Sequence, residues 1–171
     1  SGGRDDATNI SATTAASAAE ADTISGASNG GTTTYNVSDT ATAIAGATSG
    51  GRNDATNISA TTAADVSEAT TIIAATNSGT TTYNVSDTAT AIAAAGDVAA
   101  LSSAALVTVS GTANAAQADT IAAYGTAVVY NISDTATAIA GATTGGRNEA
   151  VNVSATTAAD VSEATTIIAA T

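Results

Sequence analysis

The sequence contains no cysteine, histidine, methionine, tryptophan, phenylalanine, proline or lysine, and four tyrosines are its only aromatic residues. The absence of cysteine excludes disulfide bonds and thiolate metal sites. Because histidine, cysteine and lysine supply most general bases and nucleophiles, we expect no enzymatic activity. Apolar volume must come from alanine, valine and isoleucine. Such small side chains fill space only where backbones approach closely and regularly.

Positive charge is nearly missing as well, since three arginines stand against 15 acidic residues and the net charge is −12. A chain this acidic repels nucleic acid, so we expect no nucleic-acid partner. No apolar run approaches the roughly 18 residues that span a bilayer, which predicts no membrane insertion.

Internal repetition is the strongest feature that the sequence does have. Residues 35–76 and 130–171 differ at only five positions, and each exchange keeps roughly the same size or β-branching. The offset between the two copies is 130 − 35 = 95 residues, and an intermediate copy begins at Tyr83. Repetition on this scale is typical of stacked-repeat proteins.

A shorter motif, Asn-(Ile/Val)-Ser, divides each copy again. It predicts seven coils of about 24 residues in a single solenoid over residues 1–171, with long and short coils alternating. The predicted coils start near residues 7, 33, 56, 81, 106, 128 and 151. The motif begins at Asn9, Asn36, Asn57, Asn84, Asn131 and Asn152.

Each coil is predicted to contain a strand, a helix and a glycine loop. Residues 32–38 are rich in β-branched side chains, which favours one strand. Asp39 follows and is expected to be a helix N-cap. The other expected caps are Asp87, Asp134, Thr61 and Thr156. In a long coil, residues 63–73 have apolar side chains at helical spacing, with Asp65 and Glu68 expected in the first turn.

These elements predict an α/β fold, a right-handed solenoid of about seven strand–helix coils of 21–27 residues. The handedness follows because a helix that connects two parallel strands crosses over right-handedly in nearly all proteins. The alternative is an all-β solenoid in which the Ala/Thr runs are further strands. The runs at 93–105 and 113–123 favour the helical form, since alanine is a strong helix former.

Two blocks carry a resemblance to known proteins: residues 37–45, Val-Ser-Asp-Thr-Ala-Thr-Ala-Ile-Ala, and residues 153–159, Val-Ser-Ala-Thr-Thr-Ala-Ala. They resemble the tandem repeats of very large secreted bacterial surface proteins of adhesin type, and the resemblance covers essentially the whole chain. It implies an extracellular or cell-surface location. The Gly-Gly-x-Gly-x-Asp motif of haemolysin-type calcium sites is absent, so no calcium site is carried over from that family.

The six recurring asparagines allow two interpretations. All six match the Asn-x-Ser acceptor motif for glycosylation. The interpretation we favour is a structural ladder, in which stacked asparagine side chains form hydrogen bonds from coil to coil and satisfy turn backbone groups. A ladder requires recurrence at one structural position, which is what the sequence has.

Three aspartates, Asp39, Asp87 and Asp134, are candidates for binding Ca²⁺ with loop carbonyls. We favour helix capping for them, because a Ca²⁺ site needs about six to eight oxygen ligands. Further carboxylates occur only in the Gly-Gly-Arg loops, at Asp5, Asp6, Asp54 and Glu149. We therefore expect no cofactor, with Ca²⁺ left open.

Arginine and threonine also recur. Arg4, Arg52 and Arg147 occupy one loop position, where they are candidates for binding anionic polysaccharide, but we favour capping of a helix C-terminus or neutralisation of nearby acids. Threonine runs at 32–34 and 80–82 suggest an ice-binding array, which the equivalent Ala-Val-Val at 127–129 interrupts.

Near-identical copies indicate selection on geometry and length. Both ends of the sequence read as open, so we expect the parent chain to continue, or copies to associate end to end or laterally. The predicted function is a rigid spacer, fibre or surface-layer element of a large extracellular protein. The alternative is an adhesin-type module that binds glycan, ice or mineral through a repeated face, with or without stabilisation by Ca²⁺.

Overall fold

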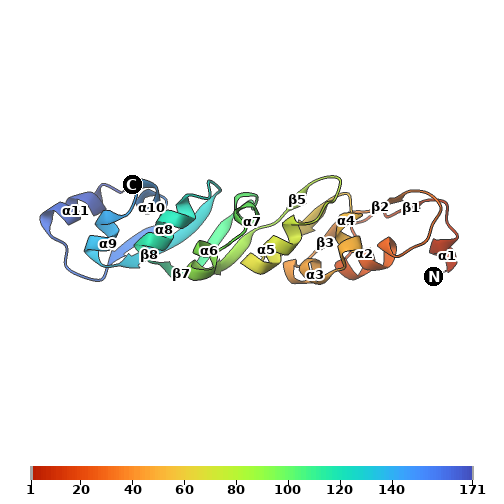
Figure 1. Ribbon diagram of the computed structural model, residues 1–171, viewed down its shortest axis with the longest axis horizontal. Coiled ribbons are helices and arrows are strands. Elements are labelled where there is room, and N and C mark those ends of the chain that lie inside the picture. The colour runs from red at the N-terminus through yellow and green to blue at the C-terminus, as the bar shows by residue number, and fades with distance from the viewer. Residues whose placement is uncertain (1, 171) are drawn as a thin grey trace. The chain divides into compact units, whose positions relative to one another are not determined.

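The computed structural model describes residues 2–170, and these form a mixed α/β fold with 11 helices and three sheets (Figure 1). All strand pairs in the sheets are parallel. The predicted α/β class is confirmed, and the all-β alternative is wrong because the Ala/Thr runs are helical. The contacts divide the chain into two compact units, one ending at Asn84 and one beginning at Val85.

The first unit contains two sheets, of strand order β1-β2 and β3-β4-β5. Its elements are α1 (Gly2–Asp5), β1 (Ile10–Ser11), α2 (Ala18–Ser25), β2 (Thr33–Thr34), β3 (Val37–Asp39), α3 (Ala41–Gly46), α4 (Ser49–Asn53), β4 (Ile58–Ala60), α5 (Val66–Ile73) and β5 (Thr81–Thr82). Helix α2 packs on α4, and α3 packs on α5.

The second unit contains one sheet, of strand order β6-β7-β8-β9. Its elements are β6 (Val85–Thr88), α6 (Ala89–Ala93), α7 (Val98–Ser102), β7 (Val107–Ala113), α8 (Ala115–Ala122), β8 (Val128–Asp134), α9 (Ala136–Gly141), α10 (Thr144–Asn148), β9 (Asn152–Ala155) and α11 (Val161–Ile168). Helix α8 packs on α10, and α9 packs on α11, as their counterparts do in the first unit.

Two kinds of repeat alternate within the units. Counted from the Gly-Gly-Arg motif, the long repeats are residues 2–28, 50–76 and 145–170, and each has a short helix, a strand and an eight-residue helix. The short repeats are residues 29–49 and 125–144, and each ends with the six-residue helix Ala-Thr-Ala-Ile-Ala-Gly. Residues 77–84 begin a further short repeat with the same Thr-Thr-Thr-Tyr-Asn sequence.

The prediction of one strand over residues 32–38 is wrong, because the run divides into β2 and β3 around Tyr35. The division follows from the neighbouring long repeat, which offers two separate pairing places. Ile10 of β1 pairs with Thr33, and Ala16 forms a bridge to Val37 after a loop. In the second unit β8 remains continuous, and its partner β7 carries the irregularity between Thr108 and Thr112.

The predicted helix caps need correction. The short helices α3, α6 and α9 begin after Thr40, Thr88 and Thr135, whose side chains accept a backbone N–H of the first turn. The aspartates expected there lie one residue earlier, at the ends of β3 and β8 and one residue before the end of β6. They are Asp39, Asp87 and Asp134.

Asp65, expected inside the first turn, is the N-cap of α5. Its carboxylate accepts the Glu68 N–H at 2.7 Å, and the Glu68 carboxylate accepts the Asp65 N–H at 3.1 Å, which completes a capping box. The same arrangement joins Asp160 and Glu163 before α11. The prediction that Thr61 and Thr156 cap the long helices is therefore wrong, because Asp65 and Asp160 cap α5 and α11.

The core is built from small side chains, as the composition requires. Among the described residues, the buried side chains are those of alanine, valine and isoleucine, one leucine and three tyrosines, and none of the buried residues is polar or charged. Ile44, Ile58 and Ile72 have no exposed surface. Burying an isoleucine stabilises the fold by about 1.5–3 kcal/mol. Because no polar or charged residue lies in the core of residues 2–170, candidate sites are to be found on the surface and where repeats contact one another.

Candidate functional site

We call the set of hydrogen bonds between two successive repeats a joint. In the joint from a long repeat to the following short repeat, the asparagine of the long repeat supplies the side-chain contacts. The Asn9 Oδ1 atom accepts the backbone N–H of Thr32 at 2.9 Å and its hydroxyl at 3.1 Å. Asn57 does the same for Thr80, at 2.8 and 3.0 Å. The backbone reinforces both joints, since the Thr32 and Thr80 carbonyls accept the N–H of Ile10 and Ile58, each at 2.9 Å.

Glycine makes this close approach possible. A Cβ atom at Gly79 would lie 2.6 Å from the Thr56 carbonyl oxygen and would also overlap the Asn57 side chain. Gly31 stands in the same relation to Thr8 and Asn9. Where a long repeat carries this asparagine, the segment that follows it therefore needs glycine directly before its threonine run.

The joint from a short repeat to the following long repeat pairs two asparagines. Asn57 donates its side-chain amide to Asn36 Oδ1 at 2.9 Å, and Asn152 donates to Asn131 Oδ1 at the same distance. The backbone register matches, because Val37 pairs with Ile58 and Ile132 pairs with Val153.

The six asparagines of the predicted ladder therefore lie in two different settings. Four of them form the pairs Asn36–Asn57 and Asn131–Asn152. The side chain of Asn9 accepts from Thr32 and does not contact another asparagine through a hydrogen bond among the described residues. Asn84 contributes its backbone carbonyl, which accepts the Ala64 N–H at 2.8 Å.

A third contact, which sequence reasoning missed, links a long repeat to the threonine near the end of the following short repeat that caps the next helix. The Asp22 Oδ1 atom accepts the backbone N–H of Thr48 at 2.9 Å and its hydroxyl at 2.7 Å. In the second unit Asp119 accepts the same two bonds from Thr143. The long helix α5 has Thr70 at this position, and no Thr-x-Gly-Gly-Arg motif follows the next short-repeat sequence. An aspartate in the long helix thus occurs together with a Thr-x-Gly-Gly-Arg motif after the next short repeat, and this pairing was the signal in the sequence that could have predicted the contact.

Arg52 and Arg147 bind helix C-termini, which agrees with the interpretation favoured from sequence. The Arg52 guanidinium donates to the carbonyls of Ile44, at 3.2 Å, and Ala45, at 3.1 Å, and to that of Ala47. Arg147 makes the equivalent set at the end of α9. Because these guanidinium groups are engaged with carbonyls, they are poor candidates for binding an anionic polysaccharide.

Two buried tyrosines anchor the glycine pairs of the long repeats. The Tyr35 hydroxyl donates to the Gly51 carbonyl at 3.1 Å, and Tyr130 donates to Gly146 at 2.8 Å. Burial, and secondarily the negative charge of Asp54, raises the pKa of Tyr35 to about 12. Burial and then Glu149 raise the pKa of Tyr130 to about 12.

The candidate Ca²⁺ ligands are engaged with backbone amides. Asp39 accepts the N–H of Thr40 at 2.8 Å and that of Ala18, in the preceding long repeat, at 3.0 Å. These bonds, that from Ala18 first, lower the pKa of Asp39. Asp134 accepts from Thr135 and Ala115 in the same way, and Ala115 likewise lowers its pKa the most. Asp87 accepts the N–H of Thr88 at 2.7 Å.

Asp39 also lies with Asp22 beside a groove between α2 and α3, and Asp134 lies with Asp119 beside its counterpart in the second unit. The grooves measure about 240 and 390 Å³. No group of three or more acidic side chains that could hold a metal ion occurs within residues 2–170. The carboxylates of the Gly-Gly-Arg loops, such as Asp54 and Glu149, do not line these grooves.

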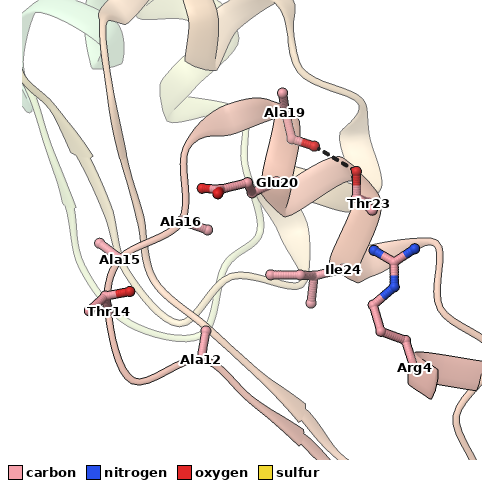
Figure 2. A pocket seen from close by; sticks show the side chains of 9 residues that line it. All are labelled: Arg4, Ala12, Thr14, Ala15, Ala16, Ala19, Glu20, Thr23 and Ile24. Carbon is pink, nitrogen blue, oxygen red and sulfur yellow. Dashed lines mark hydrogen bonds between the residues drawn. The ribbon is translucent and has the colours of Figure 1, made fainter. Parts of the chain in front are cut away.

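A cleft of about 420 Å³ lies on the first long repeat, between its loop and α2 (Figure 2). Arg4, Glu20 and Ile24 line it together with small side chains. Glu20 is committed to the capping box of α2, where it accepts the Ser17 N–H at 2.8 Å. The equivalent Glu163 accepts the hydroxyl of Thr137 from the preceding short repeat at 2.7 Å. The cleft is thus the surface on which a short repeat packs elsewhere in the chain.

The threonine hydroxyls of the predicted ice-binding array are engaged in hydrogen bonds within the protein. Thr32 and Thr80 donate their hydroxyls to asparagines, and Thr33 and Thr81 donate theirs to Asn29 and Asn77. The Thr32 and Thr80 hydroxyls link two repeats, and those of Thr33 and Thr81 form bonds within their own repeat, so fewer hydroxyls are left to order water on a flat face.

Comparison with protein-family models, with curated proteins and with solved structures finds no match. Across residues 2–170, no helix combines the length and the apolar character needed to cross a bilayer. Most of the polar groups described above form hydrogen bonds from one repeat to the next. The arrangement is suited to holding repeats in register.

Proposed function

We propose that the chain is a structural repeat segment, a right-handed α/β solenoid that serves as a rigid spacer, fibre or surface-layer element of a large extracellular protein. The observation that carries the proposal is the reuse of one set of joints. The same asparagine, aspartate, arginine and tyrosine contacts occur in both units, between residues 95 or 97 positions apart. A unique constellation would be expected for catalysis, and a repeated one for assembly.

The alternative proposal is an adhesin-type module that recognises glycan, ice or mineral through a repeated face. The paired acidic grooves of the two units favour it, because they place Asp22 with Asp39 and Asp119 with Asp134 at equivalent positions. Against it, each of these aspartates already accepts two backbone or hydroxyl hydrogen bonds. The resemblance to secreted bacterial surface repeats supports both proposals and the extracellular location equally.

Small-angle X-ray scattering on a lengthened chain tests the structural proposal. A second copy of residues 35–129 inserted after residue 129 keeps the repeat phase, because Tyr130 and Tyr35 are equivalent. We expect the maximum dimension to grow in proportion to the added repeats while the cross-sectional radius stays constant. A matched control duplicates residues 35–117, which breaks the phase. Growth of the cross-section in the in-phase chain, or equal behaviour of both chains, contradicts a solenoid spacer.

A further inference from the structure

One sequence occurs in two different surroundings in this chain. Residues 58–73 and 153–168 are identical except for Ile58 and Val153. In the first copy Ile58, Ala64, Ala69 and Ile72 are fully buried. In the second copy no residue is buried, and Ile168 is 78 % exposed. Since the sequences agree, the difference lies in what covers them.

The segment that covers a long repeat is known from the first unit. Residues 29–36 lie along residues 8–16, where Ala16 donates its N–H to the Asn36 carbonyl at 2.8 Å and Ser38 donates to the Ala16 carbonyl at 2.9 Å. Residues 77–84 lie along residues 56–64 through the corresponding bonds, such as Ala64 N–H to the Asn84 carbonyl at 2.8 Å. Both covering segments have the sequence Asn-x-Gly-Thr-Thr-Thr-Tyr-Asn.

The last long repeat presents the same binding groups, and no segment within residues 2–170 covers them. Strand β9 is the edge of its sheet. Asn152 uses its amide N–H on Asn131, as Asn57 does on Asn36, and its Oδ1 atom accepts no hydrogen bond within residues 2–170. A groove of about 370 Å³ runs beside it, lined by Val151, Val153 and Ile167 among others. In the covered copy the equivalent Oδ1 atom of Asn57 accepts from Thr80.

We propose that this face, residues 151–170, binds a segment of the Asn-x-Gly-Thr-Thr-Thr-Tyr-Asn type as an added parallel strand. The Asn152 Oδ1 atom would accept from the first threonine of that segment, and Val153 would donate to its carbonyl. An aspartate following the segment, like Asp39, would accept the Val161 N–H at the start of α11, as Asp39 accepts that of Ala18. This binding rests on the structural function proposed above, and it specifies the kind of segment that pairs with an uncovered long repeat.

A second copy of the chain docked by its first long repeat fits less well. Gly31 and Gly79 stand five residues before Asn36 and Asn84, and the corresponding residue before Asn9 is Arg4. A side chain at the glycine position overlaps the asparagine of the long repeat. Within either unit, moreover, long repeats pair their strands with short-repeat strands and not with each other.

Hydrogen exchange read by mass spectrometry tests the proposal on the full chain with a synthetic peptide of residues 29–47. We expect the peptide to slow exchange in residues 151–164 and nowhere in the first unit. The matched control is the same peptide with Gly31→Ala, which we expect to bind at least about tenfold more weakly because its methyl group meets Asn152 and the Val151 carbonyl. The chain variant Asn152→Ala should lose a comparable factor.

A second chain, with residues 29–47 joined directly after Thr171, removes the cost of bringing the peptide in from solution. Protection of residues 151–164 in this chain, and its loss with glycine replaced by alanine in the added segment, supports the proposal. No protection in either format, or equal protection by the glycine and alanine forms, overturns it. Sedimentation equilibrium of the chain alone tests the other occupant, since a dimer that Asn152→Ala dissociates, with residues 151–164 already protected in the absence of peptide, would assign the face to a second copy and overturn the proposal. In-phase growth in the scattering experiment would leave the spacer function standing in either case.

Discussion

Gly51 lies against Asp22 so closely that a Cβ atom on the glycine would overlap the aspartate carboxylate. The same carboxylate oxygen holds the N–H and the hydroxyl of Thr48, the N-cap residue of the helix that contains Gly51. Gly146 and Asp119 repeat the relationship in the second unit. Glycine is required at these positions by the neighbouring side chain and not by its backbone angles, since neither has a positive φ.

Replacement of Gly51 with alanine is expected to lower the free energy of unfolding by about 1–3 kcal/mol, the usual cost of overpacking. Gly46→Ala is the control, because a Cβ atom there meets no atom within 4 Å. Urea unfolding measures both. In an Asp22→Ala background the cost of Gly51→Ala should shrink, and an unchanged cost would mean that the overlap with Asp22 is not its cause.

Asn36→Ala is expected to destabilise the chain by about 1 kcal/mol, because the side-chain amide of Asn57 loses its acceptor. Asn131→Ala should do the same through Asn152. Asn84→Ala is the matched control, since the Asn84 side chain makes no hydrogen bond within residues 2–170 and should cost less. Thermal melts followed by circular dichroism rank the three variants. A loss at Asn84 as large as that at Asn36 would favour a continuous ladder over separate pairs.

The buried tyrosines predict loss of stability in alkali. The pKa values of Tyr35 and Tyr130 are raised from 10.0 to about 12, so the neutral phenols stabilise the fold fully below pH 10.0, and this contribution is lost as the pH rises toward 12. The Tyr35→Phe/Tyr130→Phe variant should start less stable, because it lacks two hydroxyl bonds, and should lose less stability over this range. Urea midpoints measured against pH test this. Parallel curves for the two proteins would contradict it.

Asp39 and Asp134 predict a weaker dependence on the acid side. Their pKa values are lowered by backbone N–H groups, so their contribution is present above the usual value of 3.8 and is lost as the pH falls below it. Asp39→Asn/Asp134→Asn should flatten the acid limb of the stability curve. Asp5→Asn, at a carboxylate that binds a single exposed amide, serves as the control.

The hydrogen bonds of Asp39 and Asp134 also affect whether these residues can bind Ca²⁺. Both oxygens of Asp39 and both of Asp134 accept backbone N–H groups, so a cation would have to displace those bonds. We expect the thermal midpoint to be the same with millimolar Ca²⁺ and with chelator. A midpoint that rises with Ca²⁺ concentration would instead support the adhesin-type alternative, with these aspartates as ligands.

Repetition in the sequence predicted the α/β class because every copy repeats the same β-branched, alanine-rich and glycine-rich stretches. The division of residues 32–38 into two strands was not predictable from local propensity. It depends on the loop between Ile10 and Ala16 in a different repeat, which separates the two pairing places. The caps of the short helices were missed by one residue, because both Asp39 and Thr40 are good caps and only the end of β3 decides between them.

The recurring asparagines were recognised from sequence, but their partners were not. The spacing from Asn9 to Asn36 is 27 residues and that from Asn36 to Asn57 is 21, and only the second spacing brings two asparagine side chains together. Asp22 and Asp119 escaped notice because they lie on a helix face among ordinary polar residues. Their role depends on Thr48 and Thr143, more than twenty residues away.

Scalar couplings across hydrogen bonds, measured by nuclear magnetic resonance, test most directly whether the two kinds of joint alternate along the chain. We expect couplings from the Ile10 N–H to the Thr32 carbonyl and from the Val37 N–H to the Asn57 carbonyl. Their presence together establishes both joints in one chain. A coupling from Ile10 to Asn36, with none to Thr32, would mean that all repeats stack in a single asparagine register, and the alternation would be wrong.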